Sequence, residues 1–252
     1  MIQKLSKASP LVRLLAAMGS VIASFLIFWI LVGSLPFAAV VVVSATIHEL
    51  CHWFAFRKYG IRSGIVFFGF GAVTYPLDIK EDQISVELVT KTFWVYPAGV
   101  IGNLALGLLG LCLGPLASGW YLVSWINFLL ALFNLAPASS FDGGKIVNAI
   151  TFLFDKEREE KAVWLITATE AVAIFGTIQL MNTGVITQFI GIILVFFFGR
   201  DMLAKLLTNQ HKGKLSPTEG GLSKQEAAKW AMVYFFLVSA AVIGLLFQLV
   251  YL

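Results

Sequence analysis

Long apolar segments constrain this sequence more than any other feature it has. About seven of them run for 18 residues or more, so each is long enough to cross roughly 30 Å of hydrocarbon as an α-helix. Charged residues make up only 13% of the 252 positions, about half of their share in ordinary soluble domains. The sequence therefore predicts an all-α polytopic membrane protein, with spans near residues 14–32, 36–56, 94–115, 119–140, 162–181, 184–204 and 230–251.

The predicted spans leave little sequence for any other kind of domain. The polar connection between about Asn209 and Ala228 is too short to form a hydrophobic core of its own. The first apolar segment lacks a small-residue cleavage site, so it is interpreted as a retained signal anchor. We therefore expect a single membrane domain over residues 1–252 with no soluble regulatory domain.

The positions of the basic residues predict the orientation of the spans. With a cytoplasmic N-terminus, all 18 Lys and Arg residues fall on the cytoplasmic side, where such residues are retained. Attraction to anionic lipid then explains the net charge of +4, so membrane lipid rather than nucleic acid is the expected partner. The compact length and the lack of organelle targeting favour an integral, multi-pass protein of a prokaryotic plasma membrane.

The second predicted span carries a candidate metal site. His48 and His52 are four residues apart, and Glu49 directly follows the first. Residues i and i+4 lie on one face of a helix, so both imidazoles can reach one Zn²⁺. Glu49 lies about 100° around the helix, where it can hydrogen-bond a metal-bound water without being a ligand. The alternative is a chance match, but an unpaired carboxylate costs about 2.5–3.5 kcal/mol at the centre of a membrane helix.

Two histidines leave the site incomplete, because a catalytic zinc usually has three protein ligands and one open position. The remaining histidine, His211, lies in a predicted cytoplasmic loop, so a carboxylate is the better candidate for the third ligand. Asp142 follows the fourth predicted span at its inner end and can reach the depth of His52. Pro137 and Gly143–Gly144 allow the chain to unwind there and turn the carboxylate inward. A simple helix C-terminus with a turn is the alternative.

Together these two segments resemble the site-2 protease family of intramembrane zinc metalloproteases. That family has a His-Glu-x-x-His pattern in one membrane helix and an Asn-x-x-Pro-x-x-x-x-Asp-Gly pattern in a later one. The second pattern is matched here by Asn134, Pro137, Asp142 and Gly143 with the spacing intact. Phe141 stands where a leucine is usual, which leaves the ligand assignment unaffected.

A third, weaker match lies in the third predicted span, where the family has Ala-Gly-Pro-x-x-Asn. Ala98, Gly99 and Asn103 fit that pattern, but Val100 replaces the proline. Small residues and an Asn in a membrane helix also serve ordinary helix packing. The resemblance covers a catalytic core of about residues 36–145 and says little about the additional C-terminal helices over 160–252.

The resemblance implies a zinc metalloendopeptidase that hydrolyses peptide bonds in or near transmembrane segments of substrate proteins, close to the cytoplasmic side. It implies one catalytic Zn²⁺, with metal ligands His48, His52 and Asp142, and Glu49 as general base. Asn134 resembles a family asparagine thought to hold the substrate backbone or the oxyanion, although a helix-packing hydrogen bond is an equal alternative. The expected partners are single-span transmembrane substrates and a regulatory membrane protein.

Residues 63–76 interrupt the helical pattern. They are rich in β-branched and aromatic residues, contain several Gly, and are too short to cross a membrane as a helix. They resemble the family's membrane-dipping β-hairpin, expected here near residues 63–78. Such a hairpin can present an edge to which an unwound substrate adds a strand, whereas an interfacial loop that only seals the site is the alternative.

Two further alternatives stay open at this point. Glu170, in the fifth predicted span, is interpreted either as a gate for water or substrate or, preferably, as a structural hydrogen-bonding group. A non-hydrolytic metal-binding membrane scaffold or transporter is the alternative to a protease. Transport predicts internal repeats and ionisable residues along a path across the whole membrane, and the sequence has neither feature.

Overall fold

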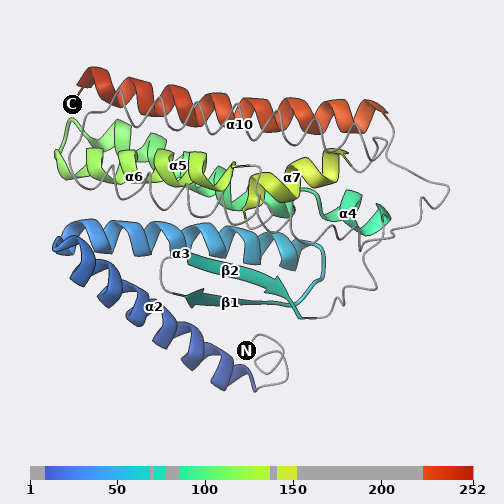
Figure 1. Cartoon of the computed structure of the whole chain (residues 1–252), viewed down its shortest axis with the longest axis horizontal. Coiled ribbons are helices and arrows are strands. Elements are labelled where there is room, and N and C mark those ends of the chain that lie inside the picture. The colour runs from blue at the N-terminus through green and yellow to red at the C-terminus, as the bar shows by residue number, and fades with distance from the viewer. Residues whose placement is uncertain (1–8, 69–70, 78–85, 137–140, 152–223, 252) are drawn as a thin grey trace, which may run out of the picture.

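The computed structural model describes residues 9–68, 71–77, 86–136, 141–151 and 224–251. Helices dominate these residues, and one short hairpin of two strands interrupts them (Figure 1). In chain order the elements are α2 (Pro10–Val32), α3 (Leu35–Lys58), β1 (Ser63–Phe68), β2 (Gly71–Pro76), α4 (Val86–Thr92), α5 (Val95–Leu113), α6 (Gly119–Asn134), α7 (Asp142–Thr151) and α10 (Lys224–Tyr251).

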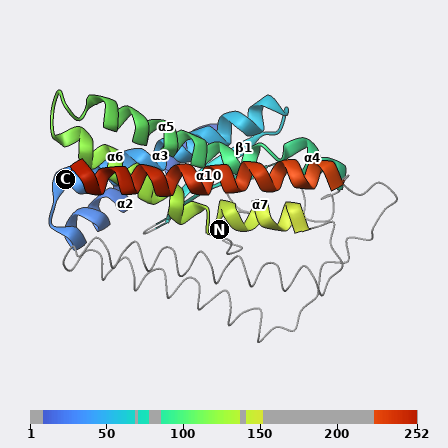
Figure 2. The ribbon, with the colours of Figure 1, turned by 90° about the horizontal axis from the view of Figure 1, so that it is seen from above.

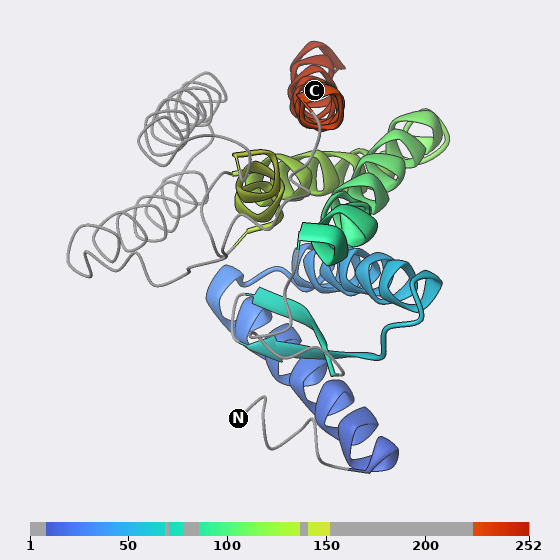
Figure 3. The ribbon, with the colours of Figure 1, turned by 90° about the vertical axis from the view of Figure 1, so that its right-hand side faces the viewer.

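The coloured elements are stacked in layers around α3. The hairpin and α2 lie on one side of this helix, while α5, α6 and α7 lie on the other side (Figures 1 and 3). α10 packs on the outside of α5, α6 and α7, as Figure 2 also shows. This arrangement places α3, which carries the histidine pair, at the centre of the described residues.

The predicted spans are confirmed only in part. Among the residues that the structure describes, four helices are long and apolar enough to cross a membrane, and they correspond to the first, second, third and seventh predicted spans: Leu11–Val32, Leu35–Lys58, Thr90–Leu113 and Gln225–Gln248. The predicted spans over 162–181 and 184–204 lie outside the described residues, so a count of seven is not confirmed.

The fourth predicted span, over 119–140, is too long at its C-terminal end. α6 is a shorter apolar helix that ends at Asn134, and α7 is a separate helix that begins at Asp142. The physical reason is Pro137, which lacks a backbone donor and disfavours a helical conformation in the residue before it. Asp142 therefore occupies a helix N-terminus rather than the end of a long span.

A tight connection turns α2 back into α3. Gly33 ends α2 with φ +70°, a left-handed conformation that glycine adopts without strain. The Ser34 side chain then caps α3 by accepting from the backbone N–H of Phe37 at 3.4 Å. At the far end of α3, Arg57 and Lys58 lie in the last turn, where positive charge is favoured by the helix dipole.

The predicted hairpin near residues 63–78 is confirmed as an antiparallel pair of strands. Its register runs from Ser63 opposite Pro76 to Phe68 opposite Gly71. The backbone N–H of Phe67 donates to Ser20 Oγ at 3.1 Å, which ties β1 to α2. Both strands contact α3, so the hairpin bridges the first two long helices.

α10 packs against residues next to α5 and at the end of α6. The Trp230 ring is stacked on Phe93 with 4.0 Å between the ring centroids. The Tyr234 hydroxyl donates to the Leu135 carbonyl at 2.7 Å, just beyond the end of α6. Both Trp230 and Tyr234 are buried. The last described helix therefore packs directly behind the chain that presents Asp142.

Candidate metal centre

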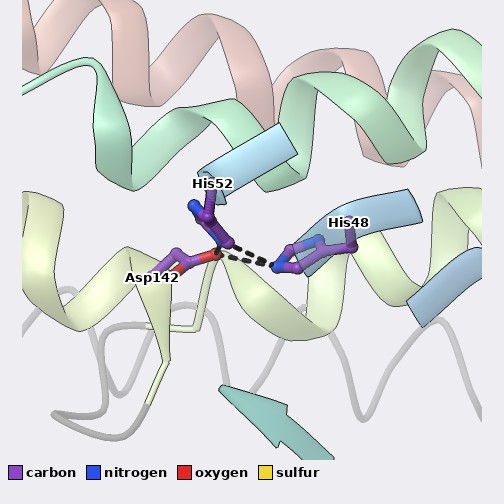
Figure 4. A group of neighbouring side chains, drawn as sticks. All are labelled: His48, His52 and Asp142. Atoms are coloured by element: carbon purple, nitrogen blue, oxygen red, sulfur yellow. Dashed lines mark hydrogen bonds and ion pairs between the residues drawn. The ribbon is translucent and has the colours of Figure 1, made fainter. Parts of the chain in front are cut away.

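Three predicted ligands come together between α3 and α7. Asp142 Oδ2 lies 3.0 Å from His48 Nε2 and 2.9 Å from His52 Nε2, and the two Nε2 atoms are 3.0 Å apart (Figure 4). All three residues are buried. A tetrahedral zinc with bonds of about 2.0–2.1 Å holds its ligand atoms roughly 3.3 Å apart, so these separations are close to what the metal requires.

The outer nitrogen of each imidazole has an oxygen partner that can accept its proton. His52 Nδ1 lies 2.7 Å from the Val95 carbonyl, which can only accept, so Nδ1 is the donor. His48 Nδ1 lies 2.6 Å from Asn103 Oδ1 and donates to it in the same way. In the neutral rings, both Nε2 lone pairs therefore face the Asp142 carboxylate. Such a cluster of lone pairs is stabilised by a cation, and metal-bound histidines are oriented in this manner.

Gly99 of α5 leaves room for an ion beside these atoms. A Cβ at this position would contact the Nε2 atoms of both His48 and His52, and it would lie 2.5 Å from that of His48. This volume is therefore within metal-bond reach of the imidazoles, and only a glycine keeps it open. Two imidazoles and one carboxylate form a ligand set that suits zinc. The residues present fit the metal that the sequence predicts.

Asp142 is fixed by its position at the start of α7. Lys145 Nζ lies 3.2 Å from Oδ1, which directs the other oxygen, Oδ2, toward the imidazoles. Burial alone would raise the pKa of the Asp142 carboxyl, but the positive charge of Lys145 beside it lowers that pKa. Burial likewise opposes the charge of Lys145, and Asp142 outweighs it and raises the lysine pKa. The carboxylate is thus ionised, as a metal ligand must be.

Gly143 allows α7 to begin close to the end of α6. A Cβ on Gly143 would collide with the backbone carbonyl of Leu135. Backbone cannot move aside as a flexible side chain can, so this glycine is needed for the approach of the two segments. The Asp-Gly step of the predicted motif therefore has two functions, one for the ligand and one for its placement.

Glu49 lies beside the ligand group but is not part of it. Its side chain is buried, and its Oε2 accepts a hydrogen bond of 2.6 Å from Thr74 Oγ1 of β2. The same hydroxyl lies 3.0 Å from the Glu49 backbone carbonyl. The hairpin therefore holds the carboxylate that the sequence predicts to be the general base.

Asn134 makes a hydrogen bond within its own helix. Its Nδ2 donates to the Leu130 carbonyl at 3.0 Å, one turn earlier in α6. This bond lies within one helix, and the catalytic assignment of Asn134 stays a prediction. Pro137, Glu170 and His211 lie outside the described residues.

Part of the chain is similar to known metalloproteases. The sequence model of peptidase family M50 matches residues 113–177, which include the Asn134–Gly143 motif. A zinc metalloprotease of Methanocaldococcus jannaschii is 30% identical over 133 residues, an alignment that covers 49% of this chain and 35% of the relative. The resemblance to the site-2 protease family is confirmed. The chain spans about a third of the length of the curated relative that it matches.

The site-2 protease from Methanocaldococcus jannaschii aligns with a TM-score of 0.44 and 23% sequence identity, over 72% of this chain and 85% of that one. A likeness at this level carries no conclusion about function. The site-2 protease motifs include neither Thr74, which contacts Glu49, nor Asn127, a buried residue of α6 that donates to Ser44 Oγ of α3 at 2.9 Å. Asn127 had a signal in the sequence, as an amide in a long apolar segment.

Proposed function

We propose that this chain is a zinc metalloendopeptidase of the site-2 protease type, which hydrolyses peptide bonds in or near transmembrane segments of other proteins. One observation carries the proposal: two imidazole lone pairs and one carboxylate converge among apolar helices, with a second buried carboxylate next to them. The similarity to a zinc metalloprotease of Methanocaldococcus jannaschii supports a metalloprotease activity.

Each residue of the site has a proposed role in hydrolysis. His48, His52 and Asp142 hold the metal, which when bound supplies Lewis-acid activation of water and of the scissile carbonyl. Glu49 takes the proton of the attacking water and passes it to the leaving nitrogen. Thr74 donates to Glu49 Oε2 and thereby fixes the rotation of the carboxylate, so we assign the proton transfer to Oε1.

Asn134 is proposed to hold the substrate backbone or the oxyanion. The Asn134–Gly143 motif supports this role, because it joins the asparagine to the ligand Asp142 within one short segment. The side chain must first leave the Leu130 carbonyl, to which it is bound at 3.0 Å. A donor released in this way can face a developing negative charge.

The outer edge of β2 is the proposed docking site for unwound substrate. The backbone N–H of Phe67 donates a hydrogen bond to Ser20 Oγ of α2, so this N–H points away from β2. In an antiparallel pair the residue opposite, Ala72, and its second neighbour Thr74 then direct their backbone groups away from β1. A strand added there would run along the edge that carries Thr74, which contacts Glu49.

The setting of the enzyme is proposed from the same features. We propose a single membrane domain in a prokaryotic plasma membrane, with its N-terminus in the cytoplasm. The active site then lies near the cytoplasmic side. The basic end of α3, Arg57 and Lys58, supports this orientation. The proposed partners are membrane lipid, single-span transmembrane substrates and a regulatory membrane protein.

Metal removal tests the proposed function directly. Purified chain is incubated in detergent with a panel of single-span test substrates, before and after treatment with a strong zinc chelator. We expect cleavage to stop when zinc is removed and to return when one equivalent of Zn²⁺ is added back, because three protein ligands leave one open position for catalysis. Cleavage is followed by gel and bound zinc by elemental analysis. A chain that binds one zinc and cuts none of the substrates would favour the metal-binding scaffold or transporter.

Replacing Thr74 separates the position of Glu49 from metal binding. We expect Thr74→Val to lower kcat by roughly 10- to 100-fold, since a hydrogen bond to a charged group is worth about 1.5–3 kcal/mol. Thr74→Ser keeps the hydroxyl and should keep most of the activity. Zinc content and KM should stay close to those of the unmodified chain.

The matched control for this change is Thr92→Val. Thr92 is also buried, but its hydroxyl donates to the Leu88 carbonyl within its own helical segment. It should therefore leave kcat unchanged. Equal rates for Thr74→Val and the unmodified chain would show that the hairpin does not orient the general base.

A further inference from the structure

Buried polar side chains link three helices behind His48. Asn127 of α6 donates through Nδ2 to the Val123 carbonyl at 2.8 Å and to Ser44 Oγ of α3 at 2.9 Å. Asn103 Nδ2 of α5 donates to Asn127 Oδ1 at 2.8 Å, and Asn103 Oδ1 lies 2.6 Å from His48 Nδ1. Both asparagines are fully buried, and none of the residues in this network is more than 4% exposed.

The Val123 carbonyl determines which group donates and which accepts in each hydrogen bond from Asn127 to His48. The Val123 carbonyl can only accept, so Asn127 must present its NH₂ group to it and its oxygen to Asn103. Asn103 must then present its own NH₂ group to that oxygen, which leaves Asn103 Oδ1 facing His48. A flip of either amide would bring two oxygens or two NH₂ groups together. The backbone of α6 thus determines which nitrogen of His48 carries the proton.

We infer that Asn127 is a positioning residue for the metal: through Asn103, it holds the proton of His48 on Nδ1 and so keeps the Nε2 lone pair available to zinc. The inference depends on the proposed metal site and adds to it a residue outside the predicted motifs. Outer partners of metal-bound histidines fix the tautomer and the ring orientation, and their loss typically lowers metal affinity by 10- to 100-fold. Without Asn127, nothing in this network would orient the Asn103 amide.

His52 does not need a residue such as Asn127 to fix its proton, whereas His48 does. The Nδ1 atom of His52 faces the Val95 carbonyl, an acceptor that cannot change its role. His48 faces an amide, which can present either an acceptor or a donor. Only the amide needs a second group to fix its direction, and Asn127 is that group.

The test compares zinc affinity in the full chain for Asn127→Leu and Ser124→Ala. Ser124 is the matched control because it lies on the same helix, is fully buried, and donates to the Gly107 carbonyl of α5 outside the network. Affinity is measured by competition with a chromogenic zinc chelator, and folding by thermal unfolding of the metal-free protein. We expect zinc binding to weaken by about 10- to 100-fold in Asn127→Leu and to stay unchanged in Ser124→Ala.

A second change is expected to restore binding in the Asn127→Leu background. Asn103→Asp places a carboxylate beside His48, and a carboxylate only accepts, so it needs no neighbour to set its direction. We expect the double variant to bind zinc more tightly than Asn127→Leu alone. In the unmodified, metal-free chain, ¹⁵N chemical shifts should place the His48 proton on Nδ1 whether or not any variant folds.

Several outcomes would overturn the inference. These are a His48 proton on Nε2, unchanged zinc affinity in folded Asn127→Leu, or equal weakening in the Ser124→Ala control. Failure of the proposed function looks different: the unmodified chain would then bind no zinc, or it would bind zinc and cut none of the single-span substrates, whatever residue stands at position 127.

Discussion

A Glu49→Gln variant is expected to bind zinc as tightly as the unmodified chain and to cleave substrate about 10²- to 10⁴-fold more slowly, the range that general acid–base catalysis contributes. Glu49 is not one of the converging ligand residues, so the metal keeps its three protein ligands. Glutamine preserves the shape of the side chain and can still accept from Thr74 Oγ1, which lies 2.6 Å from Oε2. It cannot take a proton from water. Bound zinc and cleavage rate are measured on the same preparation.

The control for this variant is Glu226→Gln, the same chemical change at an exposed position near the start of α10. It should leave both zinc content and cleavage rate unchanged. If Glu49→Gln cleaves at the normal rate, the general base lies elsewhere. If Glu49→Gln loses zinc, Glu49 belongs to the metal site rather than to the proton transfer.

The histidine pair was predictable because both residues lie on one helix. Helix geometry alone determines how residues four apart are related, and no knowledge of the rest of the fold is needed. Asp142 was a harder case, since it lies far along the chain from His48 and His52 and was identified by its motif. The structure brings its carboxylate within 3.0 Å of both imidazoles. Helix geometry thus predicted the two histidine ligands of Zn²⁺, and the resemblance to a family motif predicted the aspartate.

Other parts of the site depend on tertiary packing and could not be predicted. A threonine in a hairpin carries no information about which helix the hairpin meets, so the contact of Thr74 with Glu49 was missed. The role of Asn127 becomes visible only when Asn103 lies opposite it on a neighbouring helix. The boundary of α6 at Asn134 was missed because the apolar composition continues beyond the helix.

Gly99 also could not be identified from the sequence, because it matters by having no side chain. The sequence identifies it only as one member of a weak motif, and small residues in membrane helices commonly serve packing. The structure adds that a side chain would enter the volume between the two imidazoles. A glycine required by packing and one required by a metal can be told apart by experiment.

Gly99→Ala is expected to abolish zinc binding and, with it, cleavage. The added Cβ would contact the Nε2 atoms of both His48 and His52, in the volume that the ion needs. The imidazoles must then separate or turn away. The loss of affinity should exceed the roughly 10- to 100-fold that removal of an outer partner costs, because the ligands themselves are displaced. Zinc bound per chain is measured by elemental analysis, together with the thermal stability of the metal-free protein.

Two other glycines give the controls that make this result interpretable. Gly102→Ala lies one turn along α5 and would bring a Cβ to 2.6 Å from Cys51 Sγ, so it disturbs the packing of α5 on α3 without touching the metal site. Gly19→Ala on α2 meets nothing within 4 Å. We expect Gly102→Ala to lower stability and keep its zinc, and Gly19→Ala to keep its zinc without any loss of stability. Loss of zinc in both α5 variants would mean that Gly99 serves helix packing, and retention in Gly99→Ala would place the ion elsewhere.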